Sequence, residues 1–216
     1  MLSTRLIGIS AAAAVGLYLL FRRRKASPPP PQLERFPSPP ARQLPPALAP
    51  SELHILHSGG FAAETAEMVS VAVTTRSPAT TITTTSMDRF KNWADKYALT
   101  SRDTPLYVVF IAATIENEQP TEESGACVRF FNRRNHPDDM LSGRLTYAVL
   151  GLGDSNLLLD RQTTTAKDCN QVAKRLDARL CALGAQRCHG CGMTDDRTDN
   201  QELRPWIDSL VKTLYP

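Results

Sequence analysis

Two uninterrupted apolar runs set the strongest limit on the fold of this chain. Residues 106–113 read LYVVFIAA, and residues 145–150 read LTYAVL. Both runs are rich in β-branched and aromatic residues and neither contains a charge, so each predicts a strand that is buried on both faces. Strands of this kind occur in parallel sheets that carry helices on both sides.

Helical patterns alternate with these and with weaker strand signals, which predicts an α/β fold with a doubly wound parallel sheet. We expect strands at 53–56, 82–87, 106–113, 145–150 and 185–193, and helices at 62–73, 88–98, 122–134, 166–183 and 201–214. Pro205 is expected in the first turn of the last helix. Ligands bind such sheets beyond the carboxyl ends of the strands. The site is therefore expected in the loops at 57–65, 113–124 and 151–166.

The first 25 residues have the pattern of a signal anchor. Residues 6–21 carry no charge, and Arg22, Arg23, Arg24 and Lys25 follow at once. As a helix the apolar run spans ~24 Å, slightly less than a ~30 Å hydrocarbon core. Because the basic cluster follows the apolar run, it favours a retained single-pass transmembrane helix with the rest of the chain in the cytosol. A mitochondrial presequence is the alternative. The endoplasmic reticulum and the mitochondrial outer membrane both fit an anchor of this length.

Residues 26–50 contain ten of the 16 prolines and predict an extended tether of up to ~75 Å in front of a domain at 51–216. A ligand segment for SH3 or WW domains is a rarer alternative. Residues 1–50 carry seven basic residues and one acidic residue, a net charge of +6, whereas the rest carries 18 basic and 21 acidic residues, a net charge of −3. The basic excess therefore lies beside the anchor, and nucleic-acid binding is not indicated.

Four stretches carry a family resemblance: 106–125 (LYVVFIAATIENEQPTEESG), 145–156 (LTYAVLGLGDSN), 174–187 (KRLDARLCALGAQR) and 192–197 (GMTDDR). On these residues the domain resembles the flavodoxin family, and more narrowly the FMN-binding domains of diflavin reductases of the NADPH–cytochrome P450 reductase and methionine synthase reductase type. The resemblance implies a flavodoxin-like, five-stranded sheet with FMN at its carboxyl edge. It also implies one-electron transfer, with a separate reductase as donor, because no G-x-G-x-x-G dinucleotide motif is visible.

The same resemblance implies a set of cofactor-binding residues and no catalytic residue or metal ligand. The set has eight members, and three of them lie in the phosphate loop. The eight residues are Ser58, Gly59, Gly60, Thr114, Gly151, Gly153, Asp154 and Asp195.

The loops depart from the family where FMN would be held. The phosphate loop G-S-x-T-G-T is replaced by SGGFAAE at 58–64, and Ile115 and Leu157 stand where aromatic rings would stack. Loss of two stacking contacts, each worth ~1–3 kcal/mol, predicts FMN affinity lower by roughly two orders of magnitude or more. Glu116 and Glu118 add negative charge, and the segment at 158–166 looks like an insertion at the rim. The alternative function is therefore a flavin-free adaptor or membrane-complex subunit with a protein partner.

Three further features, a cysteine pair, a histidine and an acidic cluster, can each be explained by a structural role or by a functional one. Cys188-His189-Gly190-Cys191 is a C-x-x-C pair, but on a strand its two thiols point to opposite faces, which favours buried packing over redox or zinc chemistry. His57 contacts a phosphate or is a structural histidine. The last feature is an acidic cluster, which either steers a basic partner or is simply a solvated loop. It consists of Glu116, Glu118, Glu122 and Glu123.

Overall fold

The computed structural model describes residues 49–115, 118–157 and 169–216. Every described helix and strand lies within the predicted domain at 51–216. The predicted anchor, nearly all of the linker, Glu116 and the insertion at 158–166 lie outside the described residues. Within the described ranges, no helix combines the length and the apolar character needed to cross a bilayer.

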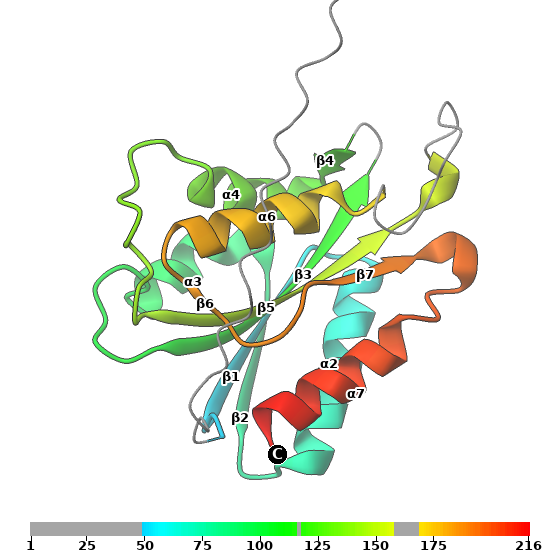
Figure 1. Ribbon diagram of the computed structural model, residues 1–216, viewed down its shortest axis with the longest axis horizontal. Helices are drawn as coiled ribbons and strands as arrows, with labels where there is room; N and C mark the ends of the chain where they lie inside the picture. Colours follow the sequence, from blue (N-terminus) through cyan, green and yellow to red (C-terminus); the bar gives the residue numbers. More distant parts are fainter. Residues whose placement is uncertain (1–48, 116–117, 158–168) are drawn as a thin grey trace, which may run out of the picture. The chain divides into compact units, whose positions relative to one another are not determined.

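The strands form the doubly wound parallel sheet that the sequence predicts (Figure 1). The parallel strands are β1 (Glu52–His57), β2 (Thr81–Ser86), β3 (Leu106–Ile115), β5 (Leu145–Gly153) and β6 (Gln186–Arg187), in the spatial order β2-β1-β3-β5-β6. A further parallel strand, β7 (Gly192–Asp195), pairs with the carboxyl half of β5. The two-residue β4 (Gln119–Pro120) pairs antiparallel with the end of β3, so that the described sheet has seven strands and not the five expected. The carboxyl ends of the parallel strands consequently meet at one edge.

Helices cover both faces of this sheet (Figure 1). The helices α2 (Phe61–Arg76) and α7 (Leu203–Leu214) lie on one face, and α3 (Phe90–Lys96), α4 (Glu122–Phe131) and α6 (Gln171–Ala182) lie on the other. Along β3, Val108 and Phe110 enter the core under α3, α4 and α6, whereas Val109 and Ile111 enter the core under α2 and α7. This alternation explains why the run at 106–113 is apolar throughout.

Local signals set two of the helix ends. The hydroxyl of Thr121 accepts a hydrogen bond from the Ser124 amide at 3.2 Å, which caps the start of α4. Gly184 has φ +83° directly after the last turn of α6, the conformation that ends a helix and that glycine adopts most easily. Pro205 is the third residue of α7, within the first turn as predicted.

Some predicted boundaries differ from those of the structure. The strand predicted at 145–150 continues to Gly153, because Gly151 and Leu152 pair with Ala112 and Ala113 of β3. The helix α6 begins at Gln171, and the predicted start at residue 166 lies outside the described residues. The last strand, predicted at 185–193, is divided into β6 and β7 by four residues that leave the sheet.

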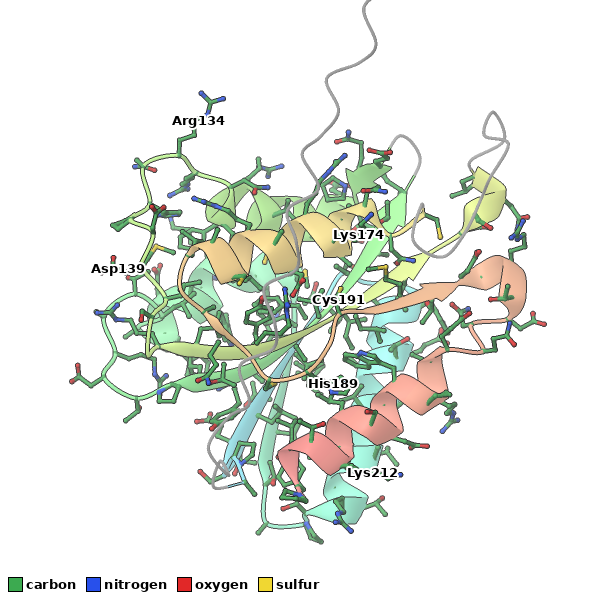
Figure 2. All side chains as sticks on the ribbon, viewed as in Figure 1. Arg134, Asp139, Lys174, His189, Cys191 and Lys212 are labelled. Atoms are coloured by element: carbon green, nitrogen blue, oxygen red, sulfur yellow. The ribbon has the colours of Figure 1, made fainter. Side chains whose placement is uncertain are left out.

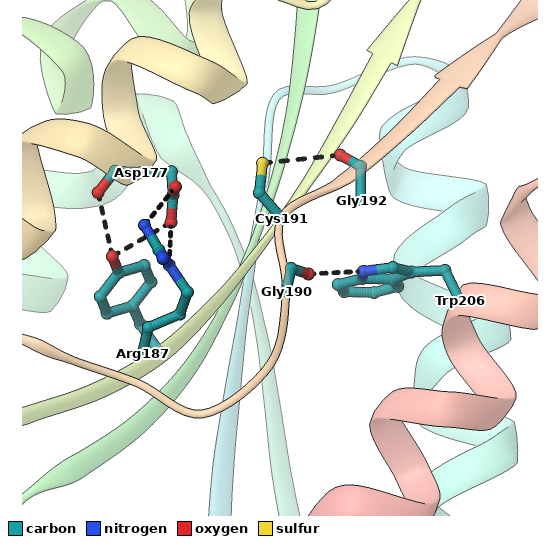
Figure 3. Close-up of polar contacts among 7 residues, drawn as sticks. Asp177, Arg187, Gly190, Cys191, Gly192 and Trp206 are labelled. Atoms are coloured by element: carbon teal, nitrogen blue, oxygen red, sulfur yellow. Dashed lines mark hydrogen bonds and ion pairs between the residues drawn. The ribbon is translucent and has the colours of Figure 1, made fainter. Parts of the chain in front are cut away.

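The break in the last strand is the C-x-x-C segment, which Figure 2 shows with His189 and Cys191 labelled. The Trp206 indole donates a hydrogen bond to the Gly190 carbonyl at 2.9 Å, as Figure 3 shows. Cys188 packs in the core under α2 and α7 and Cys191 in the other core, so the prediction of opposite faces is confirmed. Burial raises the pKa of both thiols to about 12, which keeps them protonated near neutral pH. The described residues contain no group of three or more His, Cys, Asp or Glu side chains placed to hold a metal.

Candidate functional site

The structure brings the eight predicted cofactor-binding residues to the carboxyl edge of the sheet. Ser58, Gly59 and Gly60 join β1 to α2, and Thr114 lies near the end of β3. The remaining residues lie at the ends of β5 and β7 or directly after β5; they are Gly151, Gly153, Asp154 and Asp195. Because β1, β3, β5 and β7 are neighbours in the sheet, the three predicted loops open on the same edge.

Ser58 anchors the first loop to its neighbours. Its side chain is buried, and its Oγ accepts a hydrogen bond from the Ala113 amide at 2.9 Å. Its carbonyl accepts a hydrogen bond from the Thr121 hydroxyl at 3.1 Å. Ser58 therefore ties β1 to β3 and to the start of α4.

Two glycines in left-handed conformations turn the chain into α2. Gly59 has φ +80° and Gly60 has φ +51°. The Ala62 and Ala63 amides donate to the Gly59 and Gly60 carbonyls at 3.0 and 2.9 Å, so these two donors are already used. The amides of Gly60 and Phe61 have no hydrogen-bond partner in the described part of the chain. These two amides are what the loop offers an anion.

His57 supports this turn from inside. Its Nδ1 accepts a hydrogen bond from the Gly59 amide at 3.3 Å, which requires that nitrogen to be unprotonated. Burial lowers the pKa of His57, although the charge of Asp88 opposes the shift. These contacts fit the structural interpretation of this histidine.

A carboxylate lies over the first loop. A Cβ placed on Gly59 would lie 3.1 Å from both Cδ and Oε1 of Glu123, so this side chain packs against Gly59. The Thr121 cap puts Glu123 in the first turn of α4, and the contact between Thr121 and Ser58 holds that turn beside the loop. The exposed Glu64 lies in the first turn of α2. The sequence predicts that Glu123 steers a basic partner or lies in a solvated loop, and its contact with Gly59 was not predicted.

The nearby hydroxyls bond within the fold. The Thr65 hydroxyl donates to the Phe61 carbonyl of its own helix at 2.9 Å. The Thr114 hydroxyl accepts from the Val172 amide at 3.2 Å, at the start of α6. Both side chains are buried.

The two ring-stacking positions hold exposed aliphatic side chains. Ile115 is 47% exposed and Leu157 is 44% exposed, and Phe61 in the first loop is 43% exposed. Aliphatic side chains offer dispersion contacts but no π-face for a flavin ring. The edge therefore presents apolar surface without the ring-binding chemistry of the family.

The two predicted glycines of β5 serve helix packing. A Cβ on Gly151 would lie 2.4 Å from Asn170 Oδ1, and one on Gly153 would lie 2.5 Å from Cys169 Sγ. The chain that enters α6 therefore lies directly on these two residues.

The two predicted aspartates hold backbone amides. Asp195 is buried, and its Oδ1 accepts from the Ser155 amide at 2.9 Å and from the Arg197 amide at 3.1 Å. Burial alone would raise the pKa of Asp195, but the hydrogen bonds from Ser155 and Arg197 outweigh it and hold the pKa below its ordinary value. Asp154 Oδ1 accepts from the Asn156 amide at 2.8 Å.

The loop after β3 is fastened to α6 by an ion pair. Arg175 Nη2 lies 2.5 Å from Glu118 Oε2, and Arg175 Nη1 donates to the Glu118 carbonyl at 3.3 Å. Glu118 has φ +61°, a conformation in which glycine costs less than other residues. The ion pair holds a second carboxylate side chain near the edge.

The described residues do not fit FMN in the manner that the resemblance implies. The Glu123 carboxylate packs against Gly59 in the loop where a phosphate dianion would bind, and aliphatic side chains replace the rings. These residues therefore give no support for electron transfer through FMN at this edge.

Comparisons with known proteins agree with the fold and with the resemblance. A family profile described as Flavodoxin matches residues 60–206. The chain is 35% identical over 128 residues to NADPH-dependent diflavin oxidoreductase 1 of Danio rerio, which covers 56% of this chain and 20% of that protein. It is 34% identical over 122 residues to methionine synthase reductase of Bos taurus, which covers 56% of this chain and 16% of that protein. The chain thus spans a fifth or less of these relatives.

Solved structures show the same architecture. A short-chain flavodoxin associated with a non-canonical PDU bacterial microcompartment has a TM-score of 0.53 at 20% identity, covering 76% of this chain and 98% of that one. A flavodoxin from Pseudomonas aeruginosa has a TM-score of 0.53 at 15% identity, covering 76% of this chain and 99% of that one. With the sheet order, the matched profile and the related diflavin reductase domains in agreement, this chain belongs to the flavodoxin family.

Proposed function

We propose that this flavodoxin-family domain works without FMN, as a protein-binding adaptor or membrane-complex subunit. The observation that carries the proposal is the Glu123 carboxylate packed against Gly59, in the loop where the family holds a phosphate. The apolar side chains exposed at the same edge support a role in protein contact.

Electrostatics disfavours a phosphate in this loop. A phosphate dianion bound there would lie near the carboxylate of Glu123. Two like unit charges 4 Å apart repel by about 4 kcal/mol at an effective dielectric constant near 20. A hydrogen bond to a charged group contributes about 1.5–3 kcal/mol, so two free amides only offset this repulsion. The missing aromatic stacking then leaves FMN with little net binding energy.

One-electron transfer through FMN, supplied by a separate reductase, is the second candidate. The unpaired amides of Gly60 and Phe61 at the start of α2 favour it, since they form a small anion-binding site. The similarity to diflavin oxidoreductase and methionine synthase reductase domains also favours it. It requires Glu123 to swing away from Gly59 when the phosphate enters.

FMN titration of the full-length chain, followed by flavin fluorescence, separates the two candidates. We expect a colourless protein and no saturable binding. Glu123→Ser removes the carboxylate and supplies a hydroxyl, so it should acquire measurable binding, whereas Asp208→Ser, an exposed position within α7, should not. A wild-type protein that is yellow when purified, with flavin absorbance bands, would establish the electron-transfer candidate instead.

We also propose that residues 1–25 anchor the chain in the endoplasmic reticulum or the mitochondrial outer membrane, with the domain in the cytosol. The uncharged run at 6–21 and the basic cluster after it support the proposal. Carbonate extraction of membranes tests it: the full-length chain should stay in the pellet, and its release into the supernatant would exclude a transmembrane anchor.

A further inference from the structure

The two outer edges of the sheet differ in how open they are to another strand. At one edge, β6 has two residues and the C-x-x-C segment interrupts the pairing, which protects an edge against further strands. At the other edge, β2 is a continuous six-residue strand, TITTTS, with neither charge nor proline. Within the part of the chain that the structure describes, β2 thus has neither the charge nor the proline by which edge strands usually avoid new partners.

The outward backbone groups of β2 are available for pairing. β2 pairs in parallel with β1 along its whole length, and the Thr81 amide donates to the Ser51 carbonyl at 2.8 Å. Consecutive residues of a strand direct their N–H and C=O groups to opposite edges, so Ile82 and Thr84 direct theirs away from β1. Among the described strands, β2 pairs only with β1.

A cavity of about 280 Å³ lies beside this edge, between β2 and α3. Its charged lining residues are Arg89 and Lys96, both basic. The polar part of the lining consists of two β2 hydroxyls and one amide, from Thr83, Thr85 and Asn92.

The inner wall of the cavity is held by a buried histidine. Trp93, which lines the cavity, donates from Nε1 to His54 Nδ1 at 3.3 Å. The ring of Tyr97, a further lining residue, packs edge-on against His54 with 4.4 Å between centroids. Lys96 Nζ lies 4.9 Å from the centre of the Tyr97 ring. The aromatic wall is therefore fixed, and it positions one of the two cations.

We propose that β2 and this cavity bind an extended acidic segment of a partner protein, which joins the sheet as an additional strand. The segment would pair with the backbone of Ile82 and Thr84 and direct acidic side chains toward Arg89 and Lys96. Antiparallel pairing of β2 with a second copy of this chain would bring two identical basic clusters to the same face, so charge favours the acidic segment. The inference goes beyond the proposed function, because it holds whether or not FMN binds elsewhere on the sheet.

The test uses the full-length chain and a fluorescein-labelled peptide that alternates valine with glutamate, with a valine–lysine peptide as its counterpart. Fluorescence anisotropy at low salt should show saturable binding of the acidic peptide and at least about tenfold weaker binding of the basic one. Replacing both cations, Arg89→Gln with Lys96→Gln, should weaken the acidic peptide about tenfold. Replacing two cations on α7, Arg204→Gln with Lys212→Gln, should leave it unchanged.

Two measurements locate the peptide on β2. Thr84→Pro removes an N–H that points away from β1 and leaves the hydrogen bonds to β1 in place. It should therefore abolish peptide binding and lower the folding stability only slightly. In the wild-type chain the peptide should slow hydrogen exchange at Ile82 and Thr84, which needs no variant. Equal binding of both peptides, binding without protection of β2, or no binding would overturn the proposal. So would a homodimer in sedimentation that the acidic peptide does not dissociate.

Discussion

The strands β5 and β6 and the helix α6 keep the family pattern, whereas the loop between β1 and α2 and the two ring-stacking positions, Ile115 and Leu157, do not. In the first region the retained residues have contacts within the chain. Asp177 binds Arg187 through two hydrogen bonds of 2.7 and 2.6 Å and accepts the Tyr147 hydroxyl at 3.1 Å (Figure 3). Arg179 donates to the carbonyls of Phe131 and Arg133 at 2.8 and 3.0 Å.

In that loop and at the two ring-stacking positions, the residues that were replaced have few such contacts. Ile115 and Leu157 are largely exposed, and Phe61 and Ala63 lie at the open start of α2. Aromatic rings and hydroxyls at these positions would contact a cofactor and little else. A family signature can therefore persist because the fold needs it. Retention of GLGD at 151–154 and of D-x-R at 177–179 is consequently no evidence for a bound flavin.

Removal of the Asp177 carboxylate should give the largest effect. Asp177→Ala leaves the Arg187 guanidinium and the Tyr147 hydroxyl, both largely buried, without their shared acceptor. Removing one partner of a buried pair typically costs 3–5 kcal/mol, and we expect about 3 kcal/mol here. Urea unfolding measures it, with Asp208→Ala on the surface of α7 as the control. A loss equal to that of the control would show that the retained pattern does not serve the fold.

Aromatic rings placed at the two ring-stacking positions should raise the affinity for FMN. In a Glu123→Ser background, Ile115→Tyr combined with Leu157→Tyr should tighten FMN binding roughly a hundredfold, since each stacking contact contributes about 1–3 kcal/mol. Folding stability should change little, because both side chains are exposed. FMN titration and urea unfolding of the same protein give the two readouts. Unchanged FMN affinity would mean that the replaced residues are not what separates this chain from flavin-binding relatives.

The fold was largely predictable because its signals are local. The runs at 106–113 and 145–150 predicted central strands, and Pro205 marked the first turn of the last helix, as the structure confirms. The strand boundary at Gly153 was missed because two glycines read as a loop, although β3 and β7 pair with them.

The position of the candidate site was predictable from the sequence, but the side-chain contacts within it were not. Parallel strands bring their carboxyl ends together, so the edge followed from the topology. The contact of Glu123 with Gly59 joins residues far apart in the sequence, and no periodicity or motif encodes it. The Arg89 and Lys96 cavity was missed for the same reason, because it needs the distance between β2 and α3.

Gly151 tests the claim that retained glycines serve packing. Gly151→Val places a branched side chain where a Cβ alone would lie 2.7 Å from Ala173 Cβ. We expect a loss of about 2 kcal/mol, because overpacking a filled core typically costs 1–3 kcal/mol. Gly190→Ala is the matched control, since a Cβ there meets nothing within 4 Å. Equal stability of the two variants in urea would contradict the packing role.

Asp195 gives the smallest expected effect and a specific pH dependence. Because hydrogen bonds hold its pKa in the folded state below the ordinary value, ionised Asp195 stabilises the fold above the unfolded-state pKa, near ~3.9. This contribution is lost as the pH falls through the lower, folded-state pKa. Asp195→Asn should therefore cost about 1 kcal/mol at neutral pH, since the amide still accepts from the Ser155 amide but without charge. Urea unfolding of both proteins from pH 7 down to pH 3 should show the difference shrinking below about pH 4. If the difference in unfolding free energy stays constant across this pH range, the charge of Asp195 does not stabilise the contact between the ends of β5 and β7.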